Sequence, residues 1–137
     1  MWAFYAILSA IFAALTAILA KVGLENVNSN LATAIRTVVV LFLAWIIVFA
    51  TGRHNEITNI GVKSFIFLIL SGLATGLSWL CYYKALQIGE AAKVIPVDKL
   101  SLVIGMLLAF FVLKEAMTFK TIIGGILIAA GTFVLIF

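Results

Sequence analysis

Five apolar stretches, separated by short polar turns, make up most of the 137-residue chain. They lie at residues 2–20, 31–50, 64–83, 94–113 and 121–137. A helix needs about 20 predominantly apolar residues to cross the hydrocarbon core of a bilayer. The pattern therefore predicts one all-α membrane domain over residues 1–137, a bundle of five transmembrane helices.

The composition excludes a soluble protein. Hydrophobic residues make up 66% of the chain and charged residues 10%, against about one-quarter charged residues in soluble domains. The net charge of +4 is spread over the ends of the apolar stretches, where cations anchor helices at the interface, so the sequence indicates no nucleic-acid partner. Cys81 is the only cysteine, which excludes an intrachain disulfide.

Charged residues inside the apolar stretches are the first candidates for a functional site: Arg36, Asp98 and Lys99. A charge at the bilayer centre costs roughly 2.5–3.5 kcal/mol, so such residues usually face a bundle interior or a wet cavity and have partners. Asp98 and Lys99 can also snorkel to the interface and form only a structural ion pair. Pro96 either occupies the first helical turn or, if the helix begins near Glu90, kinks it beside Asp98.

The third stretch carries polar and aromatic side chains in a regular pattern. Four hydroxyls share one helical face: Ser71, Thr75, Ser78 and Tyr82. Gly72 and Gly76 beside them form a G-x-x-x-G spacing that permits close helix contact, and Trp79, Tyr82 and Tyr83 gather toward the end. This pattern can line a solute path, or it can serve as interhelix hydrogen bonding and an interfacial aromatic belt.

The last stretch favours a dimer contact, and the arrangement of the spans brings distant charges together. Gly124 and Gly131 lie on nearly one face, with Gly125 alongside, as in helices that pack closely. Spans one and three end on the side where spans two and four begin, which brings Arg36, Asp98 and Lys99 to one side. Loop and end cations divide four to three between the sides, or four to five with Arg36 and Lys99, so the positive-inside rule leaves the orientation open.

Residues 71–137 resemble the second part of an EamA-type repeat of the drug/metabolite transporter superfamily, most specifically YYKAL at 82–86, Pro96 and LKE at 113–115. Trp2, Lys21 and Arg36 fit the first part. In that family two five-helix repeats of opposite orientation form a ten-helix transporter. The resemblance therefore implies that this single repeat pairs as an antiparallel homodimer.

The leading functional hypothesis is a secondary transporter that moves a small polar, zwitterionic or anionic metabolite by alternating access in the cell membrane. Arg36 and Lys99 would attract the solute, and Asp98 would balance Lys99 or carry a coupling proton. The other predicted cavity residues are Ser71, Thr75, Ser78, Trp79, Tyr82, Tyr83 and Ser101. A non-transporting scaffold or regulatory subunit and one half of a heterodimeric transporter are the alternatives. The sequence predicts no cofactor, no metal site and no enzymatic activity, because no catalytic constellation can be placed at membrane depth.

Overall fold

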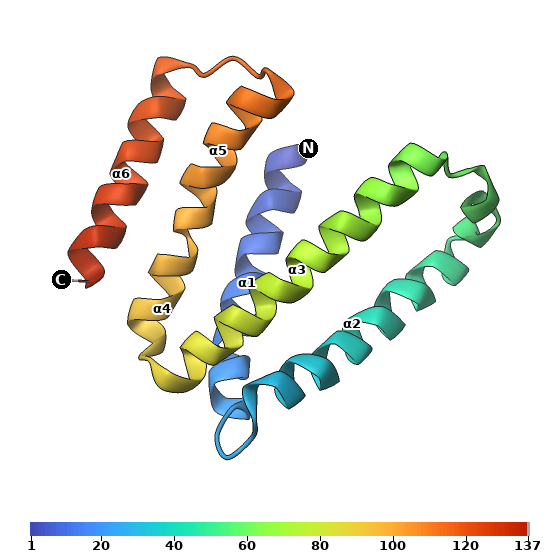
Figure 1. The fold of residues 1–137 in the computed structure, drawn as a ribbon, viewed down its shortest axis with the longest axis horizontal. Helices are drawn as coiled ribbons and strands as arrows, with labels where there is room; N and C mark the ends of the chain where they lie inside the picture. Colours follow the sequence, from blue (N-terminus) through green and yellow to red (C-terminus); the bar gives the residue numbers. More distant parts are fainter. Residues whose placement is uncertain (137) are drawn as a thin grey trace. The chain divides into compact units, whose positions relative to one another are not determined.

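The structure is a computed structural model that describes residues 1–136. Its elements follow in the order α1 (Trp2–Gly23), α2 (Ser29–Ala50), the 3-10 helix η1 (Arg53–Asn59), α3 (Val62–Ile88), α4 (Ala91–Asp98), α5 (Leu100–Leu113) and α6 (Phe119–Ile136) (Figure 1). With α4 and α5 counted as one span, the described residues hold five helices long and apolar enough to cross a membrane. This confirms the predicted all-α membrane fold.

The helices extend beyond the apolar stretches. α1 continues to Gly23, and α3 continues to Ile88, five residues past its predicted end at Tyr83. The added residues include Lys21, Lys84 and Gln87, whose polar groups suit the membrane edge rather than its interior. Hydropathy marks where a helix leaves the hydrocarbon, while the backbone hydrogen bonds continue further. The predicted end of the last span, residue 137, lies outside the described residues.

The residues form two compact units, Leu19–Gln87 and the unit that combines Met1–Ile18 with the chain from Ile88 onward. In the unit Leu19–Gln87, Asn28 begins α2, because its side-chain oxygen accepts hydrogen bonds from the backbone N–H of Asn30 at 2.9 Å and of Leu31 at 3.4 Å. After α2, Gly52 adopts φ 69°, a left-handed conformation that glycine takes without strain, and η1 follows.

The α1–α2 turn is attached to the end of α3 by two side-chain hydrogen bonds. Lys21 Nζ donates to the carbonyl oxygen of Leu86 at 2.5 Å, and Gln87 Nε2 donates to the carbonyl oxygen of Val27 at 2.7 Å. Leu86 is near the C-terminus of α3, where carbonyls lack helical partners and the helix dipole favours a cation. Leu24 and Leu86, 4% and 0% exposed, form the buried apolar centre of this attachment.

The other unit contains α4, α5 and α6, in which α6 packs against both α4 and α5. Gly125 on α6 is buried, and a Cβ atom there would lie 3.7 Å from the terminal methyl carbon of Met106 on α5. The glycine therefore lets the two helices approach closely within the chain.

The fourth span differs from the single helix predicted over residues 94–113 and matches the alternative in which a helix that begins near Glu90 contains Pro96. It begins at Ala91, which places Pro96 inside α4, and it breaks at Lys99 before α5 begins. Proline has no N–H to donate and its ring crowds the carbonyl of Ala92, so the regular ladder cannot continue. The N–H of Lys99 instead bonds to Pro96 O, and the N–H of Leu102 bonds to Lys99 O, both at 3.0 Å and both in the tighter 3-10 pattern.

Candidate functional site

Arg36 on α2 lies against two aromatic residues of α3. Its guanidinium carbon is 3.7 Å from the centroid of the Trp79 ring and 5.6 Å from the centroid of the Tyr83 ring. Trp79 and Tyr83 are four residues apart and so share one face of α3. Tyr83 is 3% exposed, and its ring meets Tyr82 edge-on at 6.3 Å between centroids.

The guanidinium is only partly satisfied. Nη1 of Arg36 is buried and has no hydrogen-bond partner among residues 1–136. A cation over an aromatic face gains about 0.5–1 kcal/mol when exposed and about 2 kcal/mol or more when desolvated. An unpaired buried donor costs about 1–3 kcal/mol. The stacking holds the guanidinium in place, while the buried N–H still lacks an acceptor.

Arg36 lies within the second membrane span and not at its end. Arg36 is the eighth residue of α2, which begins at Ser29, so it lies about 10 Å along the helix axis from that end. Thr33, one turn earlier on α2, is buried and donates its hydroxyl to the carbonyl oxygen of Ser29 at 2.9 Å. The sequence predicted Arg36, Trp79, Tyr82 and Tyr83 as cavity residues, and the structure places all four in one contact group.

The hydroxyl and glycine positions of α3 have fewer contacts than the aromatic residues beside Arg36. Ser71, Thr75 and Ser78 are exposed, and Thr75 donates its hydroxyl to the carbonyl oxygen of Ser71 at 2.9 Å. A Cβ atom at Gly72 or Gly76 would meet nothing within 4 Å. Within the described part of the chain, this face of α3 therefore has no packing partner that requires glycine.

Asp98 and Lys99 lie at the break between α4 and α5. Lys99 Nζ is 3.3 Å from Asp98 Oδ2, and the two side chains are 46% and 34% exposed. Ser101, in the first turn of α5, is exposed. These residues belong to one compact unit and Arg36 belongs to the other. The solute and coupling roles of Asp98 and Lys99 remain predictions.

The predicted packing glycines of α6 divide into two kinds. Gly125 faces Met106 inside the chain, whereas a Cβ atom at Gly124 or Gly131 would meet no atom within 4 Å among the described residues. The dimer contact predicted for Gly124 and Gly131 remains a prediction.

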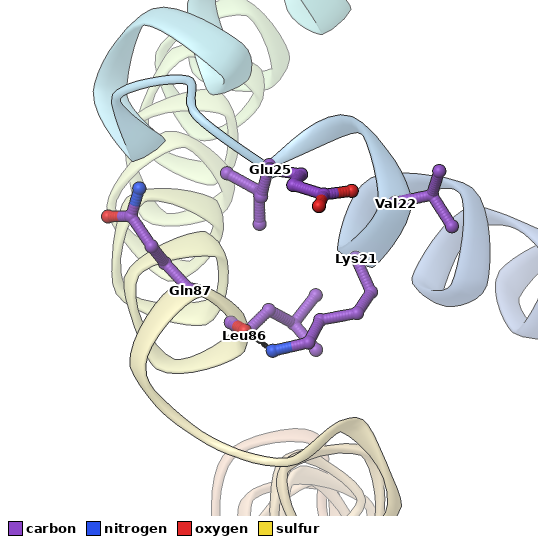
Figure 2. Close-up of a pocket in the computed structure, with 6 residues that line it drawn as sticks. Lys21, Val22, Glu25, Leu86 and Gln87 are labelled. Atoms are coloured by element: carbon purple, nitrogen blue, oxygen red, sulfur yellow. Dashed lines mark hydrogen bonds between the residues drawn. The ribbon is translucent and has the colours of Figure 1, made fainter.

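A hollow beside the α1–α2 turn was missed by the sequence analysis. It has a volume of about 410 Å³ and is lined by Lys21, Val22, Leu24, Glu25, Leu86 and Gln87 (Figure 2). The sequence does not group these residues, because Lys21 and Leu86 are 65 residues apart. The sequence feature that pointed to this grouping was that spans one and three end on the same side of the membrane. No group of His, Cys, Asp or Glu among residues 1–136 could hold a metal ion.

Comparison with known proteins decides the family. The profile of the EamA-like transporter family matches residues 1–137. The chain belongs to the EamA-like transporter family. This EamA-like chain is also similar to an "Uncharacterized transporter in cobO 3'region" of Sinorhizobium sp, with 48% identity over 134 residues that cover 98% of this chain and 95% of the relative. No solved structure matches the chain. The family and this relative support a membrane transporter.

Proposed function

We propose that this EamA-like protein is a secondary-active transporter that moves a small polar, zwitterionic or anionic metabolite by alternating access. The transporting unit would be an antiparallel homodimer of ten helices in the cell membrane. The family match and the transporter name of the Sinorhizobium relative support the transporter class. The near balance of cations between the two sides supports insertion in both orientations.

The stacked guanidinium of Arg36 carries the proposal about the solute. The guanidinium carbon lies over the Trp79 ring, and the N–H groups of the guanidinium are the donors for a ligand. A carboxylate or phosphate can accept two parallel hydrogen bonds from this fork. Such an acceptor would satisfy the buried Nη1, so binding would remove the cost of an unpaired buried donor.

Binding is tested with the fluorescence of Trp79. The chain has three tryptophans, so Trp2→Phe with Trp45→Phe leaves Trp79 as the only one. The purified double variant is titrated with amino acids, small carboxylates, sugar phosphates and cationic amines. We expect anionic or zwitterionic solutes to change Trp79 emission with saturation and cationic amines to have no effect. Saturable counterflow of the same solute in proteoliposomes would then establish transport.

Arg36→Lys supplies the decisive variant. Lysine keeps the charge but loses both the planar stack and the bidentate fork. We expect solute affinity to fall about tenfold, which corresponds to a loss of about 1.4 kcal/mol. Arg53→Lys is the matched control, because Arg53 forms an exposed ion pair with Glu56 in η1. Equal affinity in Arg36→Lys and Arg53→Lys would remove Arg36 from the site.

The coupling role of Asp98 needs a separate measurement. We expect Asp98→Asn to abolish uphill transport driven by a proton gradient while counterflow continues, since counterflow needs no net coupling. Full uphill transport in Asp98→Asn would exclude Asp98 from coupling. If no solute is transported and the protein copurifies with a different membrane protein, the scaffold or heterodimer alternative replaces the proposal.

A further inference from the structure

The hollow beside the α1–α2 turn presents two opposite charges to one space. Figure 2 shows the Glu25 carboxylate on one side of it and the Lys21 ammonium on the other side, next to Leu86. Lys21 Nζ is fixed in position by its hydrogen bond to Leu86 O. The Gln87 amide is directed to Val27 O, so its stem lines the hollow while its N–H group supports the turn.

The hollow lies at the edge of the membrane. Lys21 is two residues from the end of α1, and Leu86 and Gln87 fall in the last three residues of α3. Both helices are membrane spans, so their ends lie at the level of the lipid headgroups. With about 410 Å³, the hollow has the volume of roughly a dozen water molecules. That is enough for a phospholipid headgroup.

The lining discriminates between headgroups. An anionic headgroup without an amine offers no hydrogen-bond donor to the Glu25 carboxylate. A quaternary ammonium is preferred by aromatic cages, and none of the lining residues is aromatic. A primary ammonium, with three N–H donors, can form charge-assisted hydrogen bonds to a carboxylate.

We propose that this hollow binds a phosphoethanolamine group, with the phosphate beside Lys21 and the ammonium bonded to the Glu25 carboxylate. Val22 and Leu24 in the lining suit the apolar part of a lipid that follows the phosphate. The natural source of this group at the membrane edge is phosphatidylethanolamine, and free phosphoethanolamine has the same chemistry. The inference does not depend on the proposed transport activity.

The first test changes the ligand and leaves the protein intact. Delipidated protein in detergent is titrated with phosphatidylethanolamine, its N-methyl and N,N-dimethyl derivatives, phosphatidylcholine and phosphatidylglycerol, and bound lipid is counted by native mass spectrometry. We expect affinity to fall with each added methyl group, to about tenfold weaker for phosphatidylcholine and phosphatidylglycerol, as for the loss of a charge-assisted hydrogen bond. Equal affinity across the series would overturn the proposal. Competition by millimolar free phosphoethanolamine would show that the soluble group suffices, whereas its failure to compete would assign the site to the intact lipid.

The second test removes the carboxylate. Glu25→Gln should bind phosphatidylethanolamine and phosphatidylcholine equally, and Glu25→Asp should keep the preference. Glu115→Gln, which removes a carboxylate outside the hollow, should also keep it. A preference that persists in Glu25→Gln would overturn the assignment of the ammonium to Glu25. If Glu25→Gln fails to fold, the methylation series on the unchanged protein still decides whether the hollow prefers a primary ammonium.

Discussion

Lys114 ends α5 in a conformation that lysine rarely adopts. Its φ is 55° and its ψ 31°, in the left-handed region, and the N–H of the following Glu115 donates to Ala109 O at 3.3 Å. A Cβ atom in this region costs about 1–2 kcal/mol, which is why glycine is the usual residue at helix ends of this kind. The C-terminal end of α5 therefore carries a local strain.

We expect Lys114→Gly to raise the free energy of unfolding by about 1 kcal/mol, because glycine adopts this conformation without steric cost. The measurement is unfolding by sodium dodecyl sulfate in mixed micelles. Lys114→Ala removes the same charge but keeps a Cβ atom, so it should show no comparable gain. Equal stability of the glycine and alanine variants would contradict the conformational explanation.

At the level of single residues, the sequence located the important groups better than their partners. Arg36 was visible as a cation in an apolar stretch, and Trp79 and Tyr83 as aromatic residues near the end of another. Their contact could not be predicted, because periodicity within a helix says nothing about its register against another helix. For the same reason the bond from Lys21 to Leu86 O was not foreseen.

The break between α4 and α5 is supported from α6. Thr132, 4% exposed, places Oγ1 2.9 Å from Ile128 O in its own helix and 3.4 Å from Pro96 O. Its single hydroxyl proton can serve either carbonyl. Thr132 thus supplies a polar contact to the turn where proline interrupts the helix.

Thr132→Val keeps the shape of the side chain and removes the hydroxyl. We expect it to lower the free energy of unfolding by about 0.5–1 kcal/mol, the usual net value of a hydrogen bond between neutral groups. Thr132→Ser is the matched control, since it keeps the hydroxyl. Hydrogen exchange should also be faster at the Lys99 amide in the valine variant, and an unchanged rate there would show that Thr132 does not support the break.

At the level of elements, the all-α class and the number of membrane spans followed from apolar length alone. The break at Lys99 did not, because it depends on where the helix begins relative to Pro96. With a start at Ala91, the ring of Pro96 meets an existing carbonyl, whereas a start at residue 94 would have placed the proline among free N–H groups. A difference of three residues at the start thus decides whether the span is one helix or two.

For the whole molecule, the near balance of cations predicts both orientations in the membrane. With Cys81→Ser as background, Asn30→Cys and Asn55→Cys place single thiols at exposed positions near opposite ends of α2. We expect a membrane-impermeant maleimide to label each position from either face of the membrane, because the positive-inside rule favours neither orientation. Labelling of each position from one face only would fix a single orientation and require a different protein as the partner.

The attachment of the α1–α2 turn to the end of α3 also has a consequence for biosynthesis. The bond from Gln87 to Val27 joins residues 60 positions apart. At about 5–20 residues per second, the ribosome needs roughly 3–12 seconds to make the intervening chain. The first helical hairpin is completed at Ala50, part-way through that interval, and until Gln87 is made it is not held by its acceptor and donor on α3. We expect the nascent chain to be able to reverse its orientation in the membrane during this delay. Translation speed would then influence the ratio of the two orientations.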